Sequence, residues 1–141
     1  MNRITKRRRK TSTEQQSNQH QRSTAEELEL ILGEVAIENI SSRDVEKILA
    51  HLDLELETEK IARLVDYLLL VKQMNQEINL VSRTQVDRIL LISLWESLAA
   101  ACFLKEVPPG SLLDMGTGGG FPGIPLAMTP VSYTHLRAHE T

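Results

Sequence analysis

The stretch LLDMGTGGGFPGIPLA, residues 112–127, places five glycines and two prolines within sixteen positions. It begins in a short apolar run that ends at an acid, Asp114. Ser111–Met115 has the length of a buried parallel strand, and Pro122 with the apolar residues behind it suits the first turn of a helix. The stretch therefore predicts a strand, a glycine turn and a helix, which is the building unit of an α/β fold.

A glycine turn of this kind presents backbone N–H groups at the carboxyl end of the strand, where no Cβ keeps a ligand from the main chain. Gly118, Gly120 and Gly123 match the G-x-G-x-x-G spacing of dinucleotide sites, although that match alone is weakly specific. No GKS or GKT follows the glycines, which argues against a phosphate-binding P-loop.

Asp114 helps to choose between ligands. Its charge would repel a pyrophosphate, whereas it would attract the ammonium and sulfonium groups of S-adenosylmethionine. The alternative is a turn that only packs a helix onto a sheet, with Asp114 capping loop amides. The sequence therefore favours S-adenosylmethionine and leaves the packing turn as the competing interpretation.

Residues 24–106 are predicted to be helical. Thr24, with Glu27 three residues later, is a candidate capping box for the first helix. Ser41 or Ser42 is the candidate N-cap of the second. One face of this second helix collects the apolar residues Val45, Ile48, Leu49 and Leu52.

The third predicted helix is capped by Thr58 and continues to Asn79, and the fourth spans Val86–Leu104. Prolines and Gly110 in VPPGSLLD end the fourth helix. The residues predicted to be buried are Ile61, Leu64, Val65, Leu68, Val71 and Ile78 in the third, and Ile89, Ile92, Leu94, Trp95, Leu98 and Cys102 in the fourth.

Charge is unevenly distributed along the chain. Residues 1–22 hold seven Lys or Arg and one Glu, a net +6, whereas residues 23–141 hold nine basic and eighteen acidic residues, a net −9. Because residues 1–23 are also poor in apolar side chains, we expect a disordered basic tail. Arg7–Lys10 would serve as an electrostatic arm for RNA phosphates or as an organelle-targeting segment, unless the tail has no dedicated partner.

No apolar run reaches the roughly 18 residues of a membrane span, and no secretory signal is apparent. We therefore expect a cytoplasmic protein without a membrane partner. The one cysteine, Cys102, has no partner for an internal disulfide and is interpreted as a small buried side chain.

The glycine motif, with VDYLLLVKQMNQEINLVSRT and LWESLAA ahead of it, resembles the bacterial 16S ribosomal RNA guanine-N7 methyltransferases, also called the glucose-inhibited division protein B family. The resemblance covers about residues 28–128. It implies an α/β fold in which an N-terminal helical cap, residues 24–106, precedes a Rossmann-like S-adenosylmethionine-dependent methyltransferase domain that begins at residues 107–130.

The resemblance also implies the cofactor and its site. S-adenosylmethionine would be lined by Gly116 and Phe121, while Asp114, Gly118 and Gly120 would shape the loop. Asn75 and Asn79, in MNQEINL, fall at recurring asparagines of the family. Ser93 and Glu96, by contrast, stand where the family usually has His and Asp.

The end of the chain departs from the family. Only eleven residues follow Pro130, whereas a Rossmann-like domain takes on the order of 100 to 150 residues, so we expect most of the sheet, the second strand included, to be missing. Residues 131–141, VSYTHLRAHET, are predicted to be foreign or mis-assembled sequence. His135 and His139 lie four apart but lack further ligands, so no metal site is predicted.

The predicted reaction is methyl transfer from S-adenosylmethionine to guanine N7 of 16S ribosomal RNA, in the free RNA or in the small ribosomal subunit. Guanine N7 carries an in-plane lone pair and no proton, so alignment of the reactants replaces a general base, and no catalytic residue is assigned. This truncated chain is expected to be inactive. The alternatives are a dinucleotide-binding oxidoreductase fragment and a noncatalytic helical RNA-binding module.

Overall fold

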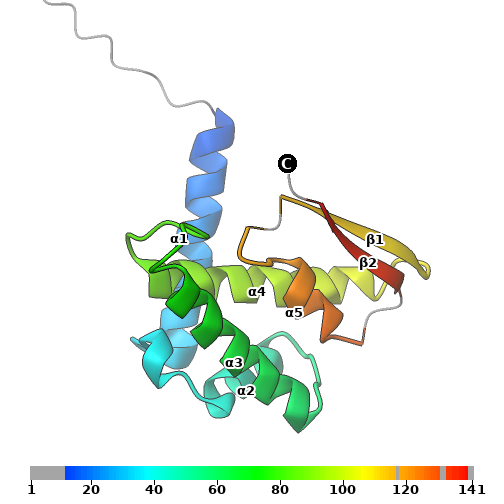
Figure 1. The fold of residues 1–141 in the computed structure, drawn as a ribbon, viewed down its shortest axis with the longest axis horizontal. Helices are drawn as coiled ribbons and strands as arrows, with labels where there is room; N and C mark the ends of the chain where they lie inside the picture. The colour runs from blue at the N-terminus through cyan, green and yellow to red at the C-terminus, as the bar shows by residue number, and fades with distance from the viewer. Residues whose placement is uncertain (1–11, 117, 131–132, 140–141) are drawn as a thin grey trace, which may run out of the picture.

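The computed structural model describes residues 12–116, 118–130 and 133–139. The elements in chain order are α1 (Ser12–Leu32), a short 3-10 helix η1 (Ile37–Asn39), α2 (Ser42–His51), α3 (Thr58–Met74), α4 (Val86–Leu104), β1 (Gly110–Met115), α5 (Gly123–Ala127) and β2 (Tyr133–His139). In Figure 1, α4 crosses the molecule, with α2 and α3 on one side of it and the two strands near its C-terminal end.

The core lies between α2, α3 and α4, and the predicted apolar stripes supply most of it. Leu64 and Leu68 of α3 and Leu94 and Leu98 of α4 are fully buried. The predicted face of α2 is confirmed, since Val45, Ile48 and Leu49 are buried and Leu52 packs against the same cluster. Of the stripe predicted in α4, Ile89, Ile92 and Cys102 are only partly buried. Val65 of the stripe predicted in α3 is likewise only partly buried.

Two predicted helix boundaries are confirmed. The Asp44 carboxylate accepts hydrogen bonds of 2.9 Å from both the N–H and the hydroxyl of Ser41, the N-cap of α2. These bonds satisfy a donor that the helix start leaves open. The fourth helix has the predicted bounds, Val86–Leu104.

The first helix differs from the prediction. It begins at Ser12, so Thr24 is a buried residue inside α1, the capping box with Glu27 is wrong, and residues 12–23 are helical where disorder was predicted. This segment contains neither Gly nor Pro, and a helix anchored through Ala25 and Leu28 can extend toward its N-terminus at little cost. In Figure 1 that half of α1 projects beyond the other helices. Arg7–Lys10 lie outside the described residues.

The third helix is shorter than predicted. Its N-cap is Glu57, with Thr58 as the first helical residue, and it ends at Met74. Ile78 therefore lies beyond the helix and is 51% exposed. The reason is Asn75, whose buried side chain accepts hydrogen bonds from the N–H groups of Leu80 and Val81 and so turns the chain away from the helix axis.

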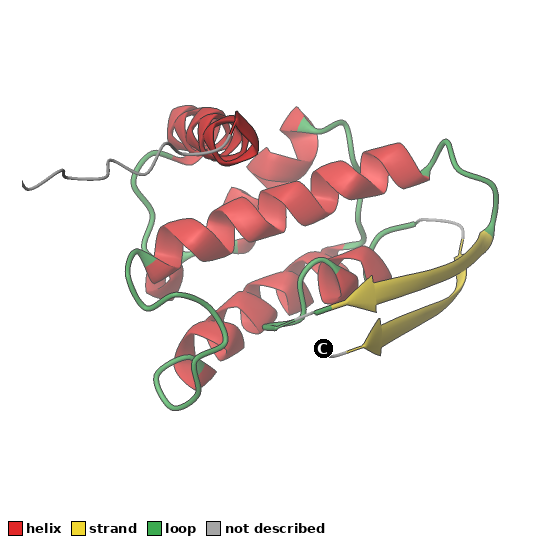
Figure 2. Cartoon of the chain, turned by 90° about the horizontal axis from the view of Figure 1, so that it is seen from above, coloured by secondary structure: helices red, strands yellow, loops and turns green. Residues whose placement is uncertain are grey.

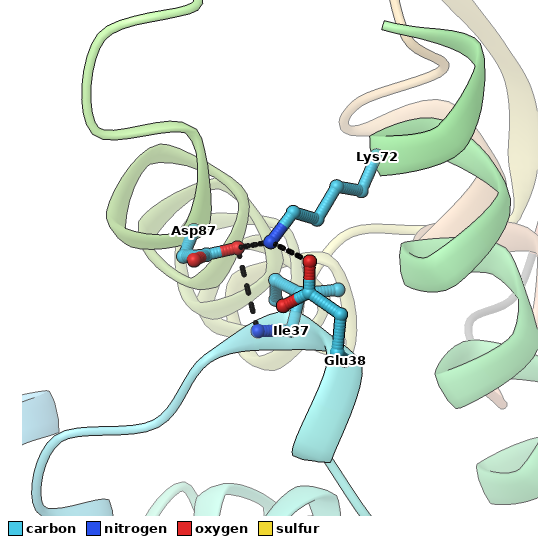
Figure 3. A network of polar contacts seen from close by, with 4 residues as sticks. All are labelled: Ile37, Glu38, Lys72 and Asp87. Atoms are coloured by element: carbon cyan, nitrogen blue, oxygen red, sulfur yellow. Dashed lines mark hydrogen bonds and ion pairs between the residues drawn. The ribbon is translucent and has the colours of Figure 1, made fainter. Parts of the chain in front are cut away.

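A polar network ties η1, α3 and α4 together (Figure 3). The Lys72 ammonium lies 2.6 Å from Asp87 Oδ1 and also pairs with Glu38, while the N–H of Ile37 donates to the same Asp87 oxygen. Burial of the ammonium opposes its charge, but the hydrogen bonds to Asp87 and Glu38 outweigh burial and raise the pKa of Lys72. The hydrogen bond from Lys72 lowers the pKa of Glu38. The network adds polar contacts between segments whose apolar side chains already share the core.

The two strands form a parallel pair with α5 between them in the chain, and both arrows point the same way in Figure 2. The register runs from Ser111 opposite His135 to Met115 opposite His139. The expectation that β1 has no partner strand is therefore wrong. Strand pairing uses backbone groups, so a segment with residues such as Tyr133 and Thr134 can supply it whatever its origin.

The predicted burial of β1 is also corrected. Asp114 is the one buried residue of this strand, while Leu113 and Met115 on the opposite face are 58% and 62% exposed. Successive side chains of a strand point to opposite faces, and here the helices cover only one face of the sheet. A strand in a complete parallel sheet is covered on both faces.

Candidate cofactor site

The loop between β1 and α5 carries the glycines singled out in the sequence. Gly116, Gly118 and Gly120 have φ values of +70°, +52° and +97°, in the left-handed region that residues with a Cβ adopt only under strain. Gly116 and Gly118 are exposed, and Gly120 is partly buried. The backbone conformation explains why these three positions are glycine.

Packing gives a second reason for glycine at position 120 and explains glycine at position 123. A Cβ on Gly120 would lie 2.5 Å from Ile124 Cδ1 and 3.0 Å from the Tyr67 hydroxyl. A Cβ on Gly123 would lie 2.6 Å from Asp114 Oδ2. The absence of side chains at Gly120 and Gly123 therefore lets the loop pack on α3 and lets α5 approach β1.

Asp114 is 7% exposed, and its Oδ2 accepts a hydrogen bond of 2.9 Å from the N–H of Gly123, the first residue of α5. This contact corresponds to the loop-capping role that the sequence left open. One oxygen of the carboxylate thus joins the end of β1 to the start of α5. The negative charge lies directly behind the glycine loop.

The loop is also held from the helical region. The Tyr67 hydroxyl on α3 donates a hydrogen bond of 2.6 Å to the carbonyl of Gly119, and the Tyr67 and Phe121 rings lie 5.2 Å apart at an angle of 53°. Burial, together with the negative charge of Asp114, raises the pKa of the Tyr67 hydroxyl, so the hydroxyl keeps its proton further into the alkaline range than an exposed tyrosine does. Sequence reasoning missed Tyr67; the available signal was a tyrosine at helical spacing inside the stripe of Leu64, Leu68 and Val71, whose hydroxyl needs a partner when buried.

The connection between α3 and α4 lies against the same loop. Asn75 Oδ1 accepts from Leu80 N–H at 2.9 Å and from Val81 N–H at 2.8 Å. The carbonyl of Leu80 is the nearest neighbour of a Cβ built on Gly118, at 3.3 Å. Asn75 therefore fixes the segment that bounds the loop, whereas Asn79 is exposed.

A separate cavity of about 490 Å³ lies between the C-terminal part of α1 and the start of α4. Its walls combine apolar side chains such as Leu28, Leu32 and Leu91 with Arg83 and Arg88. No residue of the glycine loop lines it, so it is distinct from the candidate cofactor site.

Comparison with known proteins identifies the family. The family model for rRNA small subunit methyltransferase G matches residues 60–136, which include all but the first two residues of α3, and α4, β1, the glycine loop and α5. The chain belongs to this family. The match also reaches into the 131–141 segment that was predicted to be foreign.

Curated members of the rRNA small subunit methyltransferase G family agree with this assignment. The chain is 47% identical over 68 residues to the protein from Christiangramia forsetii, and the alignment covers 48% of this chain and 32% of that relative. It is 34% identical over 84 residues to the protein from Francisella philomiragia, covering 60% and 40% of the two chains. The protein from Porphyromonas gingivalis is 50% identical over 54 residues, covering 38% and 24%.

The chain thus spans well under half the length of the curated relatives it matches. No solved structure gives a significant match. Among the described residues, no helix is long and apolar enough to cross a membrane. In the same part of the chain, no cluster of three or more His, Cys, Asp or Glu residues is arranged to hold a metal. His135 and His139 belong to β2, a strand, so their four-residue spacing is not that of a helix face.

Proposed function

We propose that the intact protein transfers a methyl group from S-adenosylmethionine to guanine N7 of 16S ribosomal RNA, and that its glycine loop binds the cofactor. One observation carries the proposal: Gly116 and Gly118 are exposed and left-handed at the carboxyl end of β1, in a chain that belongs to a methyltransferase family. Ligands of α/β proteins bind at that end of the strands.

The residues present fit the cofactor. Gly116 and Gly118 leave the main chain accessible, because no side chain covers it, and Phe121 adds a partly exposed aromatic ring beside them. Asp114 acts from behind the loop, since it is buried and engaged with Gly123; its charge favours a cationic ligand without direct contact. Gly120 shapes the loop by its packing on Ile124.

When bound, S-adenosylmethionine supplies the methyl group on a sulfonium leaving group. The protein's task is to orient it toward the guanine, since N7 presents a lone pair and has no proton to lose. We therefore assign no catalytic acid or base and no metal to this chain. The partner is 16S ribosomal RNA or the small ribosomal subunit, which places the protein in the cytoplasm.

This function implies a domain arrangement. Residues 24–106, extended by the helical residues 12–23, form a helical cap, and residues 107–130 begin a Rossmann-like domain whose remaining sheet lies outside this chain. The proposal that residues 131–141 are foreign sequence is retained, but the family match as far as residue 136 argues against it for residues 131–136. On this arrangement the exposed side chains of Leu113 and Met115 are covered by the rest of the domain.

The experiment uses the gene completed from its source genome beyond residue 130. The completed protein, incubated with labelled S-adenosylmethionine and small ribosomal subunits, should yield 7-methylguanine in 16S RNA, while the 141-residue chain should give no turnover. Label found only at another base or another atom contradicts the proposed substrate. Turnover by the 141-residue chain contradicts the domain arrangement.

A noncatalytic RNA-binding module is the second candidate, and one observation favours it: the carboxylate of Asp114 already has a structural role at Gly123. In such a module the glycine turn would only pack α5, and the protein would bind RNA without using S-adenosylmethionine. RNA binding by the completed protein without cofactor binding would support the module. Preferential binding of NAD would instead support the oxidoreductase alternative.

A further inference from the structure

The middle of the glycine loop is tied to a side chain 52 residues earlier in the chain. Tyr67, 9% exposed on α3, donates its hydroxyl hydrogen to the Gly119 carbonyl at 2.6 Å. Its ring packs on Phe121 in the same loop. The contact therefore links the helical region to the residues that the proposed function assigns to the cofactor.

The bond fixes the direction of one peptide group. The peptide between Gly119 and Gly120 is trans, so its carbonyl and its N–H point in opposite directions. With the carbonyl directed at α3, the N–H of Gly120 is directed away from α3. The direction of the Gly120 N–H is thus set by the Tyr67 hydroxyl, which donates its hydrogen to the Gly119 carbonyl.

Nothing in the glycines themselves selects this direction. Gly118, Gly119 and Gly120 follow one another, and glycine populates left- and right-handed conformations about equally, so the peptides between them can rotate at low cost. The Ile124 N–H holds the Gly120 carbonyl at 2.8 Å, which is the next peptide group along the chain. The Gly119 carbonyl needs a restraint of its own.

We propose that Tyr67 is a positioning residue of the cofactor site: its hydroxyl fixes the Gly119–Gly120 peptide and so aims the Gly120 N–H for a ligand. The inference rests on the proposed function, because it assumes that the loop binds S-adenosylmethionine. It assigns α3 a role beyond covering the domain, since a helix of the cap controls the loop that receives the cofactor.

The test compares the completed protein with two variants by nuclear magnetic resonance. Tyr67→Phe removes the hydroxyl and keeps the ring beside Phe121. Ser97→Ala is the matched control, because the Ser97 hydroxyl also donates to a backbone carbonyl at 2.6 Å, but that carbonyl belongs to Ser93 of the same helix, α4, and not to the loop. The readouts are the Gly119 carbonyl carbon resonance, the exchange rate of the Ile124 amide, and the shifts of the loop glycines during titration with S-adenosylmethionine.

We expect Tyr67→Phe to move the Gly119 carbonyl resonance, to speed exchange at Ile124, and to weaken S-adenosylmethionine binding by about three- to tenfold, the range for loss of one hydrogen bond. Ser97→Ala should leave all three unchanged. A packing role for the ring alone predicts that Tyr67→Phe behaves like the unsubstituted chain. Unchanged Gly119 resonance and unchanged affinity in Tyr67→Phe would overturn the inference.

Failure of the proposed function gives a different result. If the loop glycines of the unsubstituted completed protein do not respond to S-adenosylmethionine, the cofactor assignment fails. The positioning role is then decided by the Gly119 resonance and the Ile124 exchange rate, which need no ligand. If removal of the hydroxyl changes neither the Gly119 resonance nor the Ile124 exchange rate, the positioning role is rejected.

Discussion

The carboxylate of Asp114 accepts a hydrogen bond of 2.9 Å from the backbone N–H of Gly123, joining the end of β1 to the start of α5 across the glycine loop. Both residues are buried, and a Cβ at Gly123 would overlap the carboxylate. The acid therefore has two separable properties, an acceptor oxygen that organises the loop and a charge that acts on a ligand.

Two substitutions at Asp114 separate these properties. Asp114→Asn keeps an acceptor oxygen for Gly123 and removes the charge, so α5 should stay protected from amide exchange while the completed protein binds S-adenosylmethionine more weakly. Asp114→Ala leaves the buried Gly123 N–H unpaired, which should destabilise the loop and α5 by about 1–3 kcal/mol. Equal loss of protection in both variants would argue against the acceptor role.

The Lys72 network predicts how stability depends on pH. Because the pKa of Lys72 is raised, its contribution to the stability of the fold is complete below the usual pKa of 10.5. That contribution is lost as the pH rises through the folded-state pKa. The lowered pKa of Glu38 means that its contribution is present above 4.5 and is lost as the pH falls through the folded-state value. Lys72→Met should therefore lower the melting temperature most between these limits.

Melting temperatures of the unsubstituted chain and Lys72→Met, measured from acid to alkaline pH, test this network. Arg63→Met is the control, since Arg63 forms an exposed ion pair with Glu59 that should contribute little. If the difference in melting temperature between Lys72→Met and the unsubstituted chain does not vary with pH, the stabilisation by Lys72 is not ionic in origin.

The core predicts a contrast between two leucines. Leu94→Ala opens a cavity at a fully buried position of α4 and should cost about 2–5 kcal/mol of unfolding free energy. Leu70→Ala, at a position that is 55% exposed on α3, should change stability by less than about 1 kcal/mol. Denaturant unfolding measures both values. Similar losses at the two positions would mean that α4 does not form the centre of the core.

The basic segment ahead of α1 gives an RNA-binding prediction. If Arg7–Lys10 contact RNA phosphates, deletion of residues 1–11 should weaken RNA affinity and flatten its salt dependence by about 0.7 to 0.9 in log–log slope per lost phosphate contact. The deletion leaves the described part of α1 intact. Filter binding over a range of salt concentrations provides the slopes. Identical slopes with and without residues 1–11 would contradict RNA binding by Arg7–Lys10.

The sequence predicted those features that local physics determines. The bounds of α4 followed from an apolar stripe and the prolines that end it, and the strand, glycine turn and helix followed from the spacing of Gly and Pro. Residues 12–23 were misread because a polar helix extended from an anchored one leaves no apolar pattern. The early end of α3 depends on the bonds that Asn75 makes to later residues.

The candidate site was predicted only in part, for a related reason. The need for glycine at 116, 118 and 120 is local, because it follows from backbone conformation. The contacts of Tyr67 with Gly119 and of Leu80 with Gly118 join residues far apart in the chain, so no spacing rule reveals them. The partner strand β2 was missed because backbone pairing carries little sequence signature.

Calorimetric titration of S-adenosylmethionine into the completed protein tests the central claim most directly, with Gly118→Val and Gly33→Val as the matched pair. Both glycines are left-handed, at φ of +52° and +69°, so both substitutions impose strain, but only Gly118 lies in the loop, and a Cβ at Gly33 meets no atom within 4 Å. We predict one cofactor site that Gly118→Val abolishes and Gly33→Val preserves. Cofactor binding that survives in Gly118→Val, or no binding by the unsubstituted protein, would contradict the assignment of the cofactor to this loop.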